Sequence, residues 1–293
     1  MPTSGSQIIL CDLPVRFDTY ECCSHACRYC FVNRKADIRN IKGGETAKSL
    51  ESFILGNRNQ DLAWCDWNIP LHFGGMSDPF QPIEREAKRT LEALRVFEKY
   101  KYPFVISTKN KLIAEEPYLS IIKNCNVVVQ FSAACPQYDQ IEKGASTFDE
   151  RMDAVRKIAP FKRVIIRVQP YIPDLHDNIM ASLKTFAGAG AYGITVEGMK
   201  YIKSVPGTIR VGNDMCYPAK LLRKKYAELR DECHKLGLRF YCAENRLRNM
   251  GDDLCCCGVD GLGWKTNTAN VVHMINGGGA RSQMGRKPKK PAN

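Results

Sequence analysis

Residues 20–35 read YECCSHACRYCFVNRK and hold four cysteines within nine positions. Cys23, Cys27 and Cys30 have the spacing C-x3-C-x2-C. Structural zinc sites use four ligands, usually from two C-x2-C pairs, and ferredoxin clusters use four thiolates at other spacings. Three thiolates at this spacing suit three irons of a [4Fe-4S] cluster, whose fourth iron stays open to chelate another molecule. Tyr29 would form an apolar wall over the cluster. We interpret Cys22 as a neighbour that points away, although it could supply a fourth thiolate.

The length and composition are those of a globular protein. A chain of 293 residues fits one large α/β domain or a domain with a smaller appendage. Its 44% hydrophobic and 25% charged residues are ordinary values for a soluble protein. It contains no run of about 18 apolar residues and begins with no secretory signal, so we expect no membrane association.

The chain contains 14 cysteines, and most lie in two clusters. Without an export signal, this pattern favours metal binding in a reducing, cytoplasmic compartment over a disulfide framework. Scattered cysteines are usually small buried hydrophobes. We expect this of the six outside the clusters: Cys11, Cys65, Cys125, Cys135, Cys216 and Cys233.

The net charge of +12 favours contact with a polyanion, above all nucleic acid. A basic, solvated surface is the alternative interpretation. The tail 277–293, which we predict to be disordered, supplies only five of the positive residues.

Strand and helix patterns alternate along the chain, which predicts βαβ units and a parallel sheet or barrel. The predicted strands are 67–75, 103–110, 126–134, 163–173, 192–200 and 238–245. The predicted helices are 83–100, 114–124, 147–160, 178–190 and 219–237. We divide the chain into a barrel (1–210), a C-terminal extension with a cysteine-rich loop (211–276) and the basic tail.

The cysteine spacing ahead of a β/α repeat resembles the radical S-adenosylmethionine (radical SAM) superfamily. The blocks CSHACRYCFV, SDPFQPIEREAKRTLEAL, VISTKN and RVQPYIP resemble its spore photoproduct lyase-like branch over about residues 20–175. The resemblance implies a partial (β/α)6 TIM-like barrel with Cys23, Cys27 and Cys30 on the cluster. It also implies that SAM binds the open iron and is reductively cleaved to a 5′-deoxyadenosyl radical, which abstracts hydrogen from a substrate. An external electron donor of the flavodoxin or ferredoxin type would be required.

The resemblance also suggests cofactor-binding residues at the ends of strands. In the superfamily a GGE-like motif after the second strand receives the SAM amino group, and FGGMSDPF departs from it by placing Met76 at the acidic position. Arg167 could pair with the SAM carboxylate, or form a surface salt bridge instead. The candidate cofactor-binding residues are Tyr29, Gly74, Gly75, Ser77, Asp78, Thr108, Lys109, Ser132 and Arg167.

Two residues are candidates for direct roles in catalysis. The lyase of this branch acts on a thymine dimer in DNA and uses a cysteine as hydrogen-atom donor. Cys135, which follows a central predicted strand, is our candidate for that donor. Glu244, at the end of the last predicted strand, could contact the substrate.

A second cysteine cluster comprises Cys242, Cys255, Cys256 and Cys257. It could hold an auxiliary iron–sulfur cluster, provide a thiol that donates hydrogen, or form a lid with one structural thiol. Three consecutive residues cannot all face one cluster without a strained backbone.

The leading hypothesis is therefore a radical SAM enzyme of lyase or isomerase type. Its substrate would be a nucleobase in DNA or a nucleotide, for repair or for rearrangement of a modified base. Radical chemistry on a peptide or small metabolite is one alternative. A non-catalytic, zinc-containing nucleic-acid-binding protein is the other.

Overall fold

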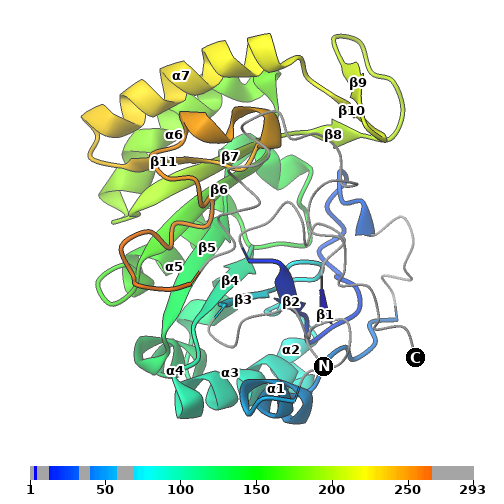
Figure 1. Cartoon of the computed structure of the whole chain (residues 1–293), viewed down its shortest axis with the longest axis vertical. Helices are drawn as coiled ribbons and strands as arrows, with labels where there is room; N and C mark the ends of the chain where they lie inside the picture. Colours follow the sequence, from blue (N-terminus) through cyan, green and yellow to red (C-terminus); the bar gives the residue numbers. More distant parts are fainter. Residues whose placement is uncertain (1–2, 5–12, 33–39, 58–68, 266–293) are drawn as a thin grey trace, which may run out of the picture.

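A curved, mostly parallel sheet organises the molecule (Figure 1). The computed structural model describes residues 3–4, 13–32, 40–57 and 69–265. Its eight-stranded sheet has the order β1-β2-β3-β4-β5-β6-β7-β11, parallel from β2 onward, with β1 antiparallel at the edge. The strands are β1 (Thr3–Ser4), β2 (Val15–Phe17), β3 (Leu71–Phe73), β4 (Phe104–Thr108), β5 (Val127–Ser132), β6 (Val164–Tyr171), β7 (Gly193–Gly198) and β11 (Arg239–Cys242).

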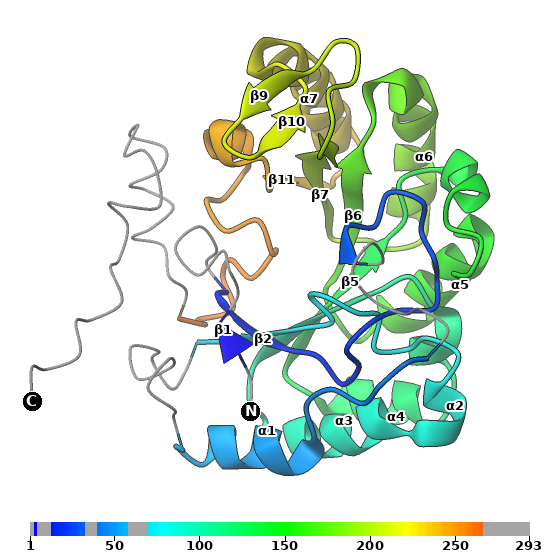
Figure 2. The ribbon, with the colours of Figure 1, turned by 90° about the vertical axis from the view of Figure 1, so that its right-hand side faces the viewer.

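Helices cover the outer face of this sheet, as Figures 1 and 2 show from two directions. They are α1 (Ala47–Ile54), α2 (Glu84–Ala87), α3 (Arg89–Tyr100), α4 (Tyr118–Asn124), α5 (Phe148–Ile158), α6 (His176–Gly188) and α7 (Ala219–Lys235). Short 3-10 turns are η2 (Lys111–Ala114), η3 (Pro136–Gln140), η4 (Pro173–Leu175) and η5 (Asn245–Met250). Capping boxes at Thr46 and Thr147 begin α1 and α5.

The strands are buried on both faces because the sheet curves around an interior of its own. Phe104, Val129 and Ile166 belong to the large core between sheet and helices. Val105, Val128 and Ile165 belong to a smaller inner cluster. Successive residues of a strand face opposite sides, so the inward positions continue from these three toward the carboxyl ends of the strands.

The segment 252–264 closes the amino end of the barrel. Cys255, Cys257 and Val259 pack into the inner cluster. Arg163, just before β6, donates from Nη1 to the carbonyl oxygens of Gly258 (2.9 Å) and Asp260 (2.6 Å). The segment is therefore a plug at the end opposite the carboxyl ends of the strands.

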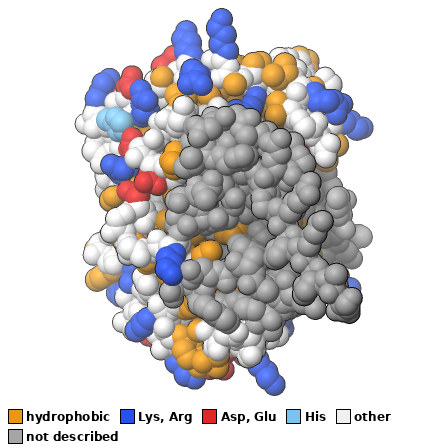
Figure 3. Space-filling view, in the orientation of Figure 1, with side chains coloured by type: hydrophobic (Ala, Val, Ile, Leu, Met, Phe, Trp, Pro, Cys, Tyr) orange, Lys and Arg blue, Asp and Glu red, His pale blue; other side chains and the backbone are white. Residues whose placement is uncertain are grey.

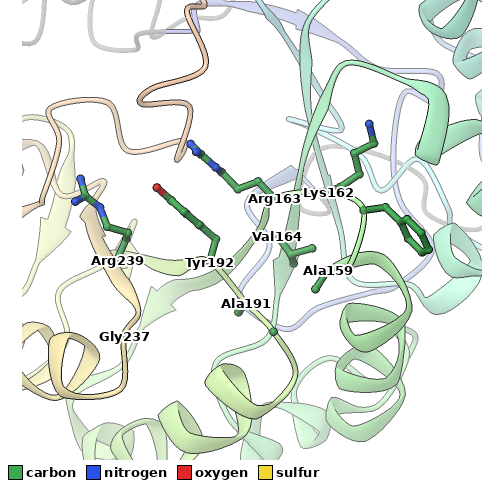
Figure 4. Close-up of a pocket in the computed structure, with 10 residues that line it drawn as sticks. Ala159, Lys162, Arg163, Val164, Ala191, Tyr192, Gly237 and Arg239 are labelled. Atoms are coloured by element: carbon green, nitrogen blue, oxygen red, sulfur yellow. The ribbon is translucent and has the colours of Figure 1, made fainter.

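A cavity of about 580 Å³ lies beside this plug, at the amino ends of β6, β7 and β11 (Figure 4). Arg163 stacks 4.0 Å from the Tyr192 ring, and both side chains point toward the plug. Arg239 contacts Asp260 (3.3 Å). The arginines of this cavity therefore hold the C-terminal segment to the barrel.

A small antiparallel sheet stands beside the carboxyl ends of the last strands. It has the order β8-β10-β9 and consists of β8 (Lys200–Tyr201), β10 (Asp214–Cys216) and β9 (Ile209–Val211). The chain passes from β10 directly into α7, so this sheet and the start of α7 form one corner of the molecule (Figure 1).

The predicted fold class is confirmed: the protein is α/β, with a partial TIM-like barrel and a cysteine-rich C-terminal segment. The predicted helix 83–100 divides into α2 and α3 because Lys88 adopts a left-handed φ of 51°. The helix–strand unit assigned to the extension continues the main sheet, since β11 pairs with β7. The domain boundary at 210 stays a prediction, and the tail 277–293 and residues 266–276 lie outside the described residues. Within the described ranges, no helix is long and apolar enough to cross a membrane.

Candidate active site at the carboxyl edge of the barrel

The segment 20–32, here called the cysteine loop, follows β2 and crosses the carboxyl edge of the sheet. Figure 2 looks onto this side and shows it in dark blue. Cys23 and Cys27 are buried and Cys30 is half-buried, and the three form no disulfide. Ala26, between the first two, has a left-handed φ of 51°, which a residue with a Cβ seldom adopts. Such strain at a loop of three cysteines is typical of a functional site.

The turn after β3 fixes the first half of the cysteine loop. Gln81, which is fully buried, donates from Nε2 to the Cys22 carbonyl (2.8 Å) and accepts at Oε1 from the Ser24 amide (2.9 Å). Ser77 donates from Oγ to the Tyr20 carbonyl (2.7 Å). The predicted cofactor-binding residue Ser77 therefore positions the loop backbone.

Asp78 connects the cysteine loop to the end of β4. Its Oδ1 accepts from Thr108 Oγ1 (2.8 Å), and its Oδ2 accepts from the Lys109 amide (2.6 Å). His25 Nδ1 lies 3.4 Å from Oδ2. Because both carboxylate oxygens have partners, Asp78 and Thr108 connect the cysteine loop to the end of β4.

A buried charged cluster supports the second half of the loop. Tyr29 donates a short hydrogen bond to Glu142, whose other oxygen accepts from Arg151 Nη1 (2.6 Å). Lys109 Nζ lies 3.3 Å from Glu142 and 5.7 Å from the centre of the Tyr29 ring. Burial acts to raise the pKa of Glu142, but Lys109 and Arg151 lower it below its ordinary value. This cluster of Tyr29, Glu142, Arg151 and Lys109 is called the anchor below.

Backbone contacts join the cysteine loop to the same region. The Arg28 amide donates to the Ile141 carbonyl (2.9 Å), and the Gly144 amide donates to the His25 carbonyl (3.1 Å). A Cβ on Gly144 would lie 2.6 Å from that carbonyl oxygen, so only glycine allows this approach.

The three thiols fit a [4Fe-4S] cluster. Burial raises the pKa of Cys23 to about 12 and that of Cys27 to about 11, and neighbouring thiols add to both shifts. In the described part of the chain, no three His, Cys, Asp or Glu side chains converge on one point that could hold a metal ion. Thiolates are the ligands that iron–sulfur clusters use, so the donor set of this loop fits such a cluster.

A row of polar side chains lines the barrel interior above the apolar inner cluster. Arg167 Nη1 donates to Ser107 Oγ (2.9 Å) and Gln130 Oε1 (3.3 Å), and Ser107 also contacts His72 Nε2 (3.0 Å). Thr195 pairs with Arg167 across the sheet, and its hydroxyl is buried with no hydrogen-bond partner. An orphaned hydroxyl beside a guanidinium fits a polar ligand in the barrel.

The row continues to the small sheet. Arg167 and Gln169 are hydrogen-bonded, Gln169 donates to Glu197, and Glu197 pairs with Lys200 of β8. Burial alone would lower the pKa of Lys200, but Glu197 raises it, so the charged pair is maintained inside the protein. Arg167 thus lines the barrel interior, and within the described residues no ion pair of its guanidinium is found.

The other predicted cofactor-binding residues, Gly74, Gly75 and Ser132, lie where backbone packing and hydrogen bonds explain their positions. Gly74 has φ +81°, and a Cβ there would lie 2.6 Å from the Ser107 carbonyl oxygen. The Ser132 carbonyl accepts from Arg151 Nη1 (2.7 Å). The Gly74–Gly75 turn and Ser132 therefore have packing reasons for their positions.

The two predicted catalytic residues are both buried. Cys135 is 1% exposed in the helix-side core, and burial raises its pKa to about 11. Glu244 is 4% exposed and accepts from Arg246 Nε (2.8 Å). A Cβ on Gly198 would come within 3.3 Å of Glu244 Oε2, so this glycine makes room for the carboxylate.

The members of the second cysteine cluster belong to two hydrophobic clusters. Cys242 belongs to the helix-side core, whereas Cys255 and Cys257 belong to the inner cluster at the amino end. Cys256 Sγ lies 4.0 Å from Cys257 Sγ. Burial raises the pKa of Cys242 to about 12, and Cys256 adds to that shift, so a shared auxiliary cluster stays a prediction.

Sequence reasoning missed most residues that hold the site together. They are His25, His72, Gln81, Gln130, Glu142, Arg151, Gln169, Thr195, Glu197 and Lys200. For the strand residues the signal was polar side chains at every second position of otherwise apolar strands. Glu142 and Arg151 lie in a loop and on an amphipathic helix, where charge is ordinary.

No protein-family model matches the chain. An uncharacterized protein of Mycobacterium tuberculosis (strain H37Rv) is 26% identical over 239 residues, covering 74% of this chain and 68% of that protein. An uncharacterized protein of Mycobacterium bovis gives the same values. The names of these sequence relatives therefore indicate no activity for this chain.

Solved structures give a more informative comparison. Spore photoproduct lyase complexed with dinucleoside spore photoproduct superposes with a TM-score of 0.65 at 14% identity, covering 83% of this chain and 78% of that one. Streptococcus suis SuiB bound to S-adenosylmethionine gives 0.57 at 14% identity, covering 79% and 51%. Both are radical SAM enzymes. This chain therefore shares the fold of these two enzymes. The predicted resemblance to the spore photoproduct lyase-like branch is thereby confirmed at the level of the fold.

Proposed function

We propose that this protein is a radical SAM enzyme that acts on a nucleobase in DNA or in a nucleotide. The observation that carries the proposal is the position of the cysteine loop at the carboxyl edge of a parallel barrel with polar side chains in its interior. In barrels of this kind the active site is built at that edge. A [4Fe-4S] cluster held by Cys23, Cys27 and Cys30 would supply the electron for reductive cleavage of SAM, and so the radical chemistry on the substrate.

The residues of this chain have three tasks in the proposal. Cys23, Cys27 and Cys30 bind the cluster, and the anchor and the turn 74–81 hold their loop in place. Arg167, the one cation in the described polar row that reaches Ser107 and Gln130, would receive the SAM carboxylate. The apolar plug closes the opposite end of the barrel to water.

A basic corner beside the barrel mouth supports a nucleic-acid or nucleotide substrate. The small sheet and the start of α7 carry five exposed basic residues: Lys203, Arg210, Lys220, Arg223 and Lys224. Figure 3 shows Lys and Arg side chains along this top edge, and Ile202 and Ile209 are exposed beside them. Asp214 is the one acidic residue between 199 and 227. Positive charge with apolar side chains suits phosphates and bases.

Other parts of the proposal come from the neighbours. Spore photoproduct lyase binds a dinucleoside photoproduct in its solved complexes, which favours a base over a peptide as the substrate here. SuiB was solved with S-adenosylmethionine, which favours the same cofactor. We propose lyase or isomerase chemistry on the base, and Glu244 and Cys135 remain candidates for substrate contact and hydrogen donation.

The experiment is anaerobic turnover of SAM with dithionite as reductant, followed by chromatography of 5′-deoxyadenosine. The proposal expects this product from the wild-type protein, more of it when DNA containing the substrate base is added, and none from a Cys27→Ala variant. A colourless, zinc-containing protein that forms no 5′-deoxyadenosine would support the non-catalytic alternative. Product formation stimulated only by peptides would support the peptide alternative.

A further inference from the structure

Two neighbouring thiols of the plug have no role in the proposed function. Cys256 and Cys257 are adjacent in the chain, and their Sγ atoms lie 4.0 Å apart. Cys256 is half-buried, whereas Cys257 is 4% exposed and packs into the inner cluster. One thiol is therefore reachable from solvent and the other is buried beside it, which is the arrangement of an attacking and a resolving cysteine.

Hydrogen bonds fix the chain on both sides of this pair. The Cys255 amide donates to Asp253 Oδ1 (2.7 Å), and Arg163 holds two backbone carbonyls that follow the pair. Between these fixed points, the Cys257 carbonyl accepts from Nε2 of Gln130, a buried side chain of β5 (3.2 Å). A chemical change at the two thiols is therefore absorbed by the pair itself and by its bond with Gln130.

We propose that Cys256 and Cys257 form a reversible dithiol, which closes to a disulfide by exchange with a low-molecular-weight disulfide such as oxidised glutathione. The Cys256 thiolate attacks a sulfur of the small disulfide, which forms a mixed disulfide and releases one small thiolate. The Cys257 thiolate then attacks Cys256 Sγ and releases the second. The two cysteine protons pass through solvent to the released thiolates, so two cysteine sulfurs are oxidised and the small disulfide is reduced to two thiols.

A disulfide between adjacent residues is strained and therefore easily reduced. The peptide bond between Cys256 and Cys257 is trans, which holds the two Cα atoms about 3.8 Å apart. Ordinary disulfides have Cα atoms at least about 4.4 Å apart, and departures from that geometry make the bond more reducible. Strained disulfides are the labile and regulatory ones. The pair is therefore suited to respond to redox conditions and unsuited to permanent cross-linking.

Closing the disulfide loosens the plug. The two Sγ atoms must approach from 4.0 Å to about 2.05 Å, which draws Cys257 out of the inner cluster and away from Gln130. Gln130 Oε1 keeps its bonds with Ser107 (3.1 Å) and Arg167 (3.3 Å), so the polar row is retained. Oxidation therefore opens the amino end of the barrel to water and leaves the carboxyl edge in place. The inference is independent of the proposed function, since no residue assigned to the cluster or to SAM takes part in the exchange.

The test follows the thiols of the tryptic peptide 249–265, whose only cysteines are Cys255, Cys256 and Cys257. The full-length, anaerobically reconstituted protein is incubated with oxidised glutathione, alkylated with iodoacetamide, digested and analysed by mass spectrometry. We expect one alkyl group on this peptide, at Cys255, and three after treatment with dithiothreitol. Cys255→Ser is the matched control and should still close the disulfide, whereas Cys257→Ser should accumulate a mixed disulfide of Cys256 with glutathione.

A second measurement follows amide hydrogen exchange across residues 252–264. Oxidised wild type should exchange these amides at least tenfold faster than reduced wild type, and dithiothreitol should restore the slow rate. Cys256→Ser keeps only the buried thiol of the pair and should exchange slowly under both conditions.

Three alkyl groups after incubation with glutathione, or a link from Cys256 to Cys242, would overturn the dithiol. A disulfide between Cys256 and Cys257 with unchanged hydrogen exchange would overturn the loosening of the plug. Both results leave the proposed function intact, because that function is tested separately by the formation of 5′-deoxyadenosine.

Discussion

Replacing Glu142 by Gln tests the anchor that supports the cysteine loop. Glu142 is 3% exposed and is the nearer acidic partner of Arg151, which is 1% exposed and also lies 3.8 Å from Asp139. Removing one member of a buried ion pair costs roughly 3–5 kcal/mol, because the other charge stays buried. Arg151 keeps the carbonyls of Ser146 and Ser132, each at 2.7 Å, so we expect the lower end, about 3 kcal/mol.

The assay is urea unfolding of the reduced, metal-free protein at pH 7.5, followed by circular dichroism. Asp153→Asn is the matched control, since its pair with Arg156 is exposed and is worth less than about 0.5 kcal/mol. The double variant Glu142→Gln/Arg151→Met should lose less stability than the sum of the two single variants, by more than about 1 kcal/mol in the free energy of unfolding. A loss for Glu142→Gln no greater than that of the control would refute the reasoning.

The same change has a pH signature. The pKa of Glu142 lies below its ordinary value of 4.5 in the folded protein, so its contribution is present above pH 4.5. That contribution is lost as the pH falls through the folded pKa. The difference between wild type and Glu142→Gln should therefore shrink below pH 4.5, and a difference that grows on acidification would contradict the assignment.

Other regions give further expectations. Burial, with Arg167 and Arg16, lowers the pKa of His72 to about 3 in the folded protein. Below pH 6.5 the unfolded chain binds a proton at this residue and the folded protein does not, so stability falls with the pH. Between pH 7.5 and 5.5 the free energy of unfolding, measured with urea, should fall by about 1 kcal/mol less in His72→Asn than in wild type. Arg163→Ala should lower the free energy of unfolding by about 2–3 kcal/mol, because the plug loses its two hydrogen bonds to Arg163. The affinity for SAM, measured by calorimetry, should not change. A large loss of SAM affinity there would show that the plug shapes the barrel mouth.

Much of the fold could be predicted because the strands are buried on both faces and the helices are strongly amphipathic. Residues 126–134 contain β5, and 147–160 contain α5 with its Thr147 capping box. The prediction was wrong in detail at Lys88, where a left-handed residue divides one helix pattern into two. Short elements such as β2 and the β8-β10-β9 sheet were missed, since two or three residues give no measurable period.

The position of the cysteine loop could be predicted from the sequence, whereas the residues that support the loop could not. The spacing of Cys23, Cys27 and Cys30 is a local pattern, and the structure brings their loop to the expected edge of the barrel. The partners of that loop lie far along the chain, as Tyr29 and Glu142 do, and no local pattern pairs them. Asp78 stays a predicted cofactor-binding residue, and its hydrogen bonds with Thr108 and Lys109 connect the cysteine loop to the sheet.

The most direct test of the central claim is the content of iron, sulfide and zinc per chain after anaerobic reconstitution. It is measured for wild type, for the Cys23→Ala/Cys27→Ala/Cys30→Ala variant and for a Cys255→Ser/Cys257→Ser variant. The account predicts about four irons in wild type and in the Cys255/Cys257 variant, and none in the triple variant. About eight irons, with four surviving the triple substitution, would contradict the single site, and zinc without iron would contradict the radical SAM function itself.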